Sequence, residues 1–233
     1  MAKKHLKEAY TSWRAYIAEF FGTFVFVFVS LGAILSGIFF GEIGVLGIAI
    51  ASGFIYAAMV FATVHVSGGH INPAITLSLW FTHKISTLVA LLYVVSQIAA
   101  GFAAAGLLLL IFGTRALDFS LGAQVSGGGI SLQGAIIVET VLATILVYTF
   151  YSTMVDRRGP VSFGPLALGF VVCASFLIGG SLSGAVLNPS KVLGASVISG
   201  TYDNLPAWIV GPLVGSVFGI VYEFAFLKKK AKK

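Results

Sequence analysis

The sequence predicts an all-α membrane protein with six transmembrane helices and two shorter re-entrant half-helices, arranged as an inverted repeat. Three observations lead to this prediction. Of the 233 residues, 58% are hydrophobic, only 9% are charged, and the mean hydropathy is +1.01, whereas a soluble domain carries about 25% charged residues. The uncharged stretches are long enough to cross a bilayer. Two Asn-Pro pairs occupy matching places in the two halves of the chain.

The individual helices follow from the length that a bilayer requires, which is about 20 apolar residues per crossing. Six stretches meet this requirement: Ile17–Phe40, Ile43–Val66, Ile85–Phe112, Ile130–Met154, Val161–Leu182 and Pro206–Leu227. Glu19, Glu139 and Glu223 are the carboxylates near or inside them. Each stretch is predicted to form one transmembrane helix in contact with the lipid bilayer.

The basic residues predict the orientation, because short cytoplasmic loops are rich in Lys and Arg. Twelve of the 14 basic residues fall on one side if the chain crosses six times: Lys3, Lys4, Lys7, Arg14, Lys84, Arg157, Arg158, Lys228, Lys229, Lys230, Lys232 and Lys233. We therefore expect a multi-pass protein of the plasma or cell membrane with both termini in the cytoplasm. The net charge of +6 is then explained by topology and contact with anionic headgroups, and we expect no nucleic-acid partner.

The chain contains an internal repeat. The first Asn-Pro pair begins 53 residues after Glu19, and the second begins 49 residues after Glu139. These matches divide residues 1–233, a single channel domain, into a first repeat at 16–113 and a second at 130–227. Each repeat holds three crossings, so the second enters the membrane from the opposite face. Inverted repeats are typical of transporters and channels, with the site near the bilayer midplane.

Each Asn-Pro pair predicts the start of a short helix within the membrane. Asn is a preferred N-cap, and Pro is tolerated at the first helical position. The expected half-helices are Ala74–Trp80 and Ser190–Val197. Gly and Ser residues precede both pairs, and non-helical backbone at this depth is stable only inside protein or beside a water-filled cavity. The two loops are expected to fold into the membrane from opposite sides.

The N-termini of these half-helices are expected to meet at the centre of the bilayer. Each carries the equivalent of about half a positive charge, so cations, including hydronium, are repelled there. The amides of Asn72 and Asn188 can both donate hydrogen bonds to a passing water, whose own hydrogens then turn outward and interrupt a proton wire. The predicted pore centre consists of Asn72, Pro73, Ala74, Asn188, Pro189 and Ser190.

These motifs resemble the aquaporin, or major intrinsic protein, family. The resemblance rests on the two Asn-Pro loops, the segment Ala18-Glu19-Phe20-Phe21-Gly22-Thr23, the segment from Ser67 to His70, and Gln97. It implies a six-helix bundle with two half-helices, one pore per subunit and a homotetramer. It also implies that Glu19 and Glu139 brace the two re-entrant loops.

The resemblance also places a selectivity filter, by spacing from the two Asn residues. The implied filter is Ser52, Phe176, Ala185 and Lys191. The family usually has Arg where this chain has Lys191, so a compact ammonium group replaces a planar guanidinium group with several N–H donors. Ser190 stands where Ala is usual. Water-selective relatives usually have an aromatic residue in place of Ser52 and a His in place of Phe176, so we expect a wider opening than a strict water filter.

Other kinds of site are not favoured by the sequence. His65 and His70 lie in the first loop, but no Cys or carboxylate adjoins them, so we expect vestibule or loop-packing residues and no metal. No phosphate-binding loop or nucleophilic triad is recognisable, and we expect no cofactor and no enzymatic activity. Several glycines of the third and sixth stretches are expected to let helices approach closely: Gly101, Gly106, Gly211, Gly215 and Gly219.

The sequence therefore predicts a passive channel for water and small uncharged solutes that excludes cations and protons. Two alternatives remain at this stage. The first is a channel for small weak-acid or anionic solutes, in which Lys191 is an attractive charge. The second is a weakly conducting structural or adhesive membrane protein, which the short outer loops disfavour.

Overall fold

The chain folds into a bundle of helices. The computed structural model describes residues 12–41, 43–123 and 130–227, and all regular elements within these ranges are helical. The N-terminal and C-terminal lysines used to predict the orientation lie outside these ranges. The long helices are α2 (Trp13–Phe40), α3 (Val45–Ser67), α5 (Thr87–Phe112), α6 (Leu132–Phe150) with the π-helical turn η2 (Tyr151–Val155), and α7 (Gly164–Gly179) after the 3-10 turn η3 (Val161–Phe163).

The remaining elements are the C-terminal helix and three short helices. The C-terminal helix is continuous through α9 (Leu205–Ser216), α10 (Phe218–Tyr222) and the π-helical turn η4 (Glu223–Leu227). The short helices are α4 (Pro73–Phe81), α8 (Pro189–Ser199) and the 3-10 helix η1 (Thr114–Gly122). Both expected half-helices thus form, each slightly longer than predicted.

Five helical segments of the described part are long and apolar enough to cross a membrane. They correspond to five of the six predicted stretches. The remaining stretch, Val161–Leu182, was predicted as a helix that is too long. The α-helix there, α7, has 16 residues, or about 24 Å. It ends at Gly179, whose carbonyl accepts hydrogen bonds from the backbone N–H groups of Leu182, Ser183 and Gly184. The chain leaves the helix early because these turns begin the loop that leads to α8.

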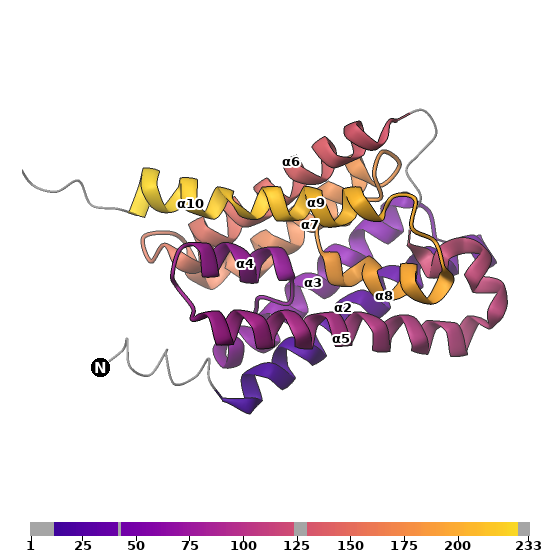
Figure 1. Ribbon diagram of the computed structural model, residues 1–233, viewed down its shortest axis with the longest axis horizontal. Coiled ribbons are helices and arrows are strands. Elements are labelled where there is room, and N and C mark those ends of the chain that lie inside the picture. Colours follow the sequence, from indigo (N-terminus) through magenta and orange to yellow (C-terminus); the bar gives the residue numbers. More distant parts are fainter. Residues whose placement is uncertain (1–11, 42, 124–129, 228–233) are drawn as a thin grey trace, which may run out of the picture.

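The two short helices α4 and α8 lie inside the bundle. In Figure 1 they occupy the layer between α5 and the α9–α10 helix, with α4 toward one end of the molecule and α8 toward the other. Both contact α5 and α9, and they also contact each other. Most of their residues are buried. The long helices therefore enclose the half-helices, as is required of short helices at membrane depth.

Glycines set the closest helix contacts, because a side chain there would strike the backbone of the neighbouring helix. A Cβ atom on Gly53 of α3 would lie 2.5 Å from the carbonyl oxygen of Gly169 on α7, and the reverse distance is also 2.5 Å. Gly211 and Gly215 bring α9 equally close to α6 at Glu139 and Ala143.

Gly101 fixes the position of α8. A Cβ atom there would lie 2.1 Å from the backbone oxygen of Ser190, and one on Gly194 would lie 2.6 Å from the backbone oxygen of Gly101. The expectation was wrong for Gly106, around which no described atom outside its own helix turn lies within 4 Å. On the same helix α5, Gly101 therefore contacts α8, whereas Gly106 has open space beside it.

This difference gives a matched test of the α5–α8 contact. We expect Gly101→Ala to destabilise the protein by about 1–3 kcal/mol, because the methyl group must push α8 away from α5. Gly106→Ala is expected to be neutral or slightly stabilising, since Ala favours a helix over Gly by up to about 1 kcal/mol. The thermal unfolding midpoints of both variants in detergent provide the measurement. Equal midpoints would show that α5 and α8 do not pack as described.

The turn between α6 and α7 is held by a charged pair. Arg158 donates to both carboxylate oxygens of Asp156, at 2.8 and 2.5 Å, and to the backbone oxygen of Phe226 in η4 at 2.8 Å. The guanidinium lowers the pKa of Asp156 to about 2. Tyr222 also donates to Asp156, at 3.3 Å. These contacts tie the C-terminal end of the bundle to the α6–α7 turn.

Candidate functional site

The two half-helices begin in the same way. The Oδ1 atom of Asn72 accepts a hydrogen bond from the backbone N–H of Ala74 at 2.8 Å, and Oδ1 of Asn188 accepts one from Ser190 at 3.0 Å. Pro73 and Pro189 occupy the first helical positions. Each Asn is therefore the N-cap of a helix whose first N–H groups point back toward the preceding loop.

The two Asn side chains also connect the two loops. Nδ2 of Asn72 donates to the carbonyl of Leu187 at 3.1 Å, and Nδ2 of Asn188 donates to the carbonyl of Ile71 at 2.8 Å. Each amide thus binds the residue that precedes the other Asn. Because an Asn amide has two N–H groups, each side chain keeps one further donor at the place where the two helix N-termini meet.

The loop backbone is strained at this junction. Ile71 and Leu187 adopt φ values of +40° and +54°, and Ala185 adopts +45°. Such left-handed conformations are uncommon outside glycine, and for a β-branched residue such as Ile71 they are outliers. They turn the carbonyls of Ile71 and Leu187 toward the Asn amides, so the strain is compensated by the hydrogen bonds that hold the junction.

Two buried glutamates hold the strained loops in place. Glu19 accepts hydrogen bonds from the backbone N–H groups of His70 and Ile71, at 2.9 and 2.6 Å, and from Ser67 Oγ at 2.6 Å. Gln97 Nε2 donates to the same carboxylate at 2.7 Å. The Glu19 side chain is fully buried. Its acceptor capacity is used by the first loop and by α5.

Glu139 makes the corresponding contacts in the second half. Its oxygens accept from the backbone N–H groups of Val186, at 2.9 and 3.0 Å, and Leu187 at 2.9 Å, and from Ser183 Oγ at 2.6 Å. Ser67 and Ser183 were not among the predicted residues. A signal was available, because each lies five positions before the Asn of its own loop.

Further side chains anchor the loop carbonyls, and sequence reasoning missed them. Tyr93 donates to the carbonyl of Ser67 at 2.9 Å, and Trp208 Nε1 donates to the carbonyl of Ser183 at 2.6 Å. Thr76 accepts from Gln97 Nε2 at 2.9 Å. These residues come from α5, α9 and α4, and nothing in their spacing along the chain distinguishes them from other buried residues.

The two histidines have different environments. His70 is 1% exposed, its Nδ1 atom lies 3.1 Å from Thr76 Oγ1, and its ring packs against Tyr93 and Phe150 at centroid distances of 4.9 and 6.1 Å. Of the two roles expected for the histidines, vestibule and loop packing, His70 therefore has the second. His65 is exposed in the last turn of α3. In the described ranges no group of three His, Cys, Asp or Glu side chains is placed to hold a metal ion.

Two of the four predicted filter residues are in direct contact. Lys191 is the third residue of α8, and its Nζ atom lies 4.0 Å from the centroid of the Phe176 ring. This is cation–π geometry. Their exposures are 1% and 3%. The ion pairs among the described residues are Lys84–Glu223 and Arg158–Asp156, so the Lys191 ammonium is buried against an aromatic face without a paired carboxylate.

The other two filter residues have different neighbours. Ala185 lies in the second loop beside the end of α7, with its Cβ atom 3.3 Å from where a Cβ on Gly179 would be. The Ser52 hydroxyl lies 3.0 Å from that of Ser30 on α2. Its described contact therefore joins α3 to α2 and does not reach Lys191.

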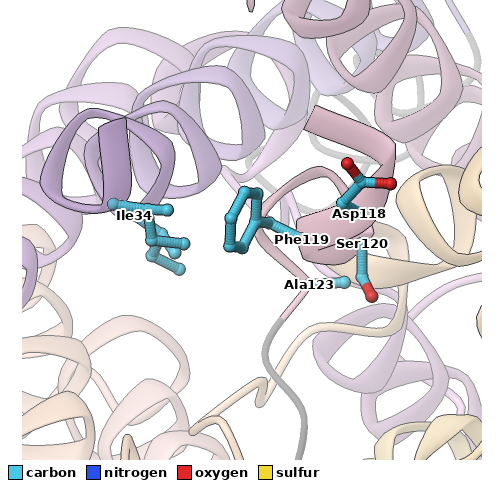
Figure 2. A pocket seen from close by; sticks show the side chains of 7 residues that line it. Ile34, Asp118, Phe119, Ser120 and Ala123 are labelled. Atoms are coloured by element: carbon cyan, nitrogen blue, oxygen red, sulfur yellow. The ribbon is translucent and has the colours of Figure 1, made fainter. Parts of the chain in front are cut away.

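A cavity of about 320 Å³ lies elsewhere, between α2 and η1. Figure 2 shows Ile34 on one side of it, Phe119 between, and Asp118, Ser120 and Ala123 on the other side. None of the predicted site residues lines it. The arrangement of chemical interest is therefore the junction of the two loops and the buried Lys191, which together offer amide N–H donors, two helix N-termini and one cation to a small polar molecule.

Comparisons with known proteins agree with this arrangement. The family model described as Major intrinsic protein matches residues 6–222. The chain is 38% identical to Aquaporin TIP4-4 of Zea mays, with 92% of this chain and 87% of the relative covered, and 36% identical to Aquaporin TIP1-2 of Zea mays, with 93% and 87% covered. The aquaglyceroporin structure from Plasmodium falciparum matches with a TM-score of 0.80 at 24% identity, over 92% of this chain and 96% of that chain. The last comparison concerns the fold.

Proposed function

Because the chain belongs to the major intrinsic protein family, we propose that it is a passive membrane channel that conducts water and small uncharged solutes. Its relatives are named aquaporins, and as a channel of this family it is not an enzyme. The observation that carries the proposal is the pair of reciprocal hydrogen bonds between the Asn72 and Asn188 amides and the opposite loops. Each amide retains one N–H for a molecule that passes the junction.

Exclusion of cations and protons is the second part of the proposal. The N-termini of α4 and α8 place two partial positive charges at the junction. In its protonated form the buried side chain of Lys191 adds a positive charge one helical turn from Asn188. A cation at this depth would lose its hydration and meet charges of its own sign. An uncharged molecule meets hydrogen-bond donors instead.

The topology and assembly are also proposed. We place residues 16–113 and 130–227 in the membrane as inverted repeats, with both termini in the cytoplasm of a cell whose plasma or cell membrane holds the protein. The matching Glu, Ser and Asn contacts of the two loops support the repeat. Large apolar side chains on the outer surface, such as Leu110 at 83% exposed, are available to lipid or to other copies. The family favours a homotetramer of such subunits.

Stopped-flow light scattering of proteoliposomes tests the channel directly. We expect osmotic water permeability well above that of empty liposomes, with the weak temperature dependence of flow through a pore. The same vesicles are then challenged with glycerol and urea to define the solute range. Water permeability equal to that of empty liposomes would contradict the proposed function.

The second candidate function, a channel for small weak-acid or anionic solutes, is favoured by one observation. The Lys191 ammonium is buried against Phe176 and forms no ion pair with a carboxylate of the described residues, so its charge is available to attract an anion. Acetate or lactate uptake into the same vesicles, followed with an internal pH dye, distinguishes the two. Uptake of a weak acid faster than that of glycerol would favour this second candidate.

A further inference from the structure

Tyr56 of α3 has a buried hydroxyl group that forms no hydrogen bond with the described residues. The residue is 1% exposed, and its hydroxyl makes no hydrogen bond within the described part of the chain. The other fully buried rings of this kind are paired: Tyr93 with the Ser67 carbonyl, Tyr151 with the Ser78 carbonyl and Trp208 with the Ser183 carbonyl. A buried polar group without a partner costs about 1–3 kcal/mol, so an unpaired hydroxyl in the interior calls for an explanation.

The position of Tyr56 points to the junction of the two loops. It lies one helical turn after Ser52, on the same face of α3. Its ring stands edge-on against Phe26 of α2, with centroids 5.0 Å apart and an interplanar angle of 84°. One turn further along the same face of α3, Val60 packs against the first loop, where a Cβ atom on Gly69 would lie 3.1 Å from Val60 Cγ1. Tyr56 is therefore held by α2 at its ring and lies on a face of α3 that packs against the first loop.

We propose that Tyr56 is a specificity-determining residue of the channel, whose hydroxyl binds the molecule passing Asn72 and whose ring limits the width of the passage there. This inference rests on the proposed channel function. The Asn amides offer N–H donors, whereas a phenol hydroxyl both donates and accepts. A water whose oxygen is bound by an amide can give a hydrogen to Tyr56, so the passing molecule completes the hydrogen bonds of both.

The hydroxyl is tested by Tyr56→Phe, which keeps the ring and its contact with Phe26. The variant should fold as well as the wild type, because the lost hydroxyl has no hydrogen-bond partner in the described ranges. We expect the water permeability per channel to fall about 2- to 5-fold, the effect of losing about one net hydrogen bond, with a higher activation energy of water flow. Tyr222→Phe is the matched control, because the Tyr222 hydroxyl binds Asp156 at the end of the bundle, and it should conduct like the wild type.

The ring is tested by Tyr56→Leu, which shortens the side chain. We expect the ratio of glycerol to water permeability to rise several-fold, whereas Tyr56→Phe, which keeps the ring, should not raise that ratio. Wild-type rates and activation energies in Tyr56→Phe, or an unchanged ratio in Tyr56→Leu, would overturn the inference while the wild type still conducts. A wild-type protein that does not conduct would overturn the proposed function and this inference with it.

Discussion

Replacement of Lys191 by alanine is expected to make the channel conduct protons or small cations. The ammonium is buried close to the Phe176 ring and, within the part of the chain that the structure describes, forms no ion pair, so little water is available to screen its field. Two unit charges about 4 Å apart repel by about 4 kcal/mol at an effective dielectric constant near 20. The half-helix N-termini remain in the variant and retain part of the barrier. We therefore expect proton or cation permeation to rise by at least about tenfold, with water flow preserved.

The measurement is the collapse of an imposed pH gradient, followed with a dye trapped in the proteoliposomes, together with water permeability from the same preparation. Lys191→Arg is the matched control, since it keeps the positive charge and a guanidinium group can also stack on the Phe176 ring. It should hold the pH gradient and narrow the range of solutes because the guanidinium is larger. If Lys191→Ala also holds the gradient, Lys191 is not the main electrostatic barrier.

The second large effect is expected at Glu139. Its carboxylate oxygens accept hydrogen bonds from the backbone N–H groups of Val186 and Leu187 and from the Ser183 hydroxyl. In Glu139→Gln an NH₂ group replaces one of these acceptors and faces a backbone N–H. A buried donor loses its partner, and the strained φ of Leu187 loses its support. We expect a loss of about 3 kcal/mol or more in the free energy of unfolding, together with a large loss of water conduction.

Thermal unfolding in detergent and stopped-flow water permeability check this expectation. Glu223→Gln is the control, because Glu223 forms an ion pair with Lys84 at 2.6 Å in which both side chains are partly exposed, at 22% and 30%. Partly exposed pairs contribute about 0–1 kcal/mol, so this variant should keep nearly the wild-type midpoint. A Glu139→Gln midpoint close to that of Glu223→Gln would show that the second loop does not depend on the Glu139 carboxylate.

The sequence predicts the elements whose causes are local. Apolar length sets the long helices, and the Asn-Pro pairs set the starts of α4 and α8, because capping and the missing proline N–H act within one turn. The end of α7 was predicted three residues too late, at Leu182, because residues 179–183 carry no charge. The Gly-Gly-Ser run that begins at Gly179 is a turn signal, and this turn leads into the loop before α8. The apolar composition of the stretch alone does not distinguish a helix that continues to Leu182 from one that ends in a turn at Gly179.

Contacts between distant parts of the chain were harder to predict. The spacing from Asn188 proposed Phe176 and Lys191 together, and the structure places them in contact. The same spacing argument proposed Ser52, whose described partner is Ser30, because a small side chain does not extend far from its helix. The role of Tyr56 was missed because a tyrosine within an apolar span resembles any other core residue. Only its unpartnered hydroxyl distinguishes it.

The reciprocal Asn hydrogen bonds also bear on how the protein is made. The carbonyl of Ile71 is bound by an amide 117 positions later in the chain, and the carbonyl of Leu187 by one 115 positions earlier. During synthesis the carbonyl of Ile71 therefore has no amide partner until Asn188 has been translated. Glu19 and Gln97 are available earlier and can hold the first loop in the meantime. The last hydrogen bond of the first loop, to the Ile71 carbonyl, can thus form only after Asn188 has been added to the chain.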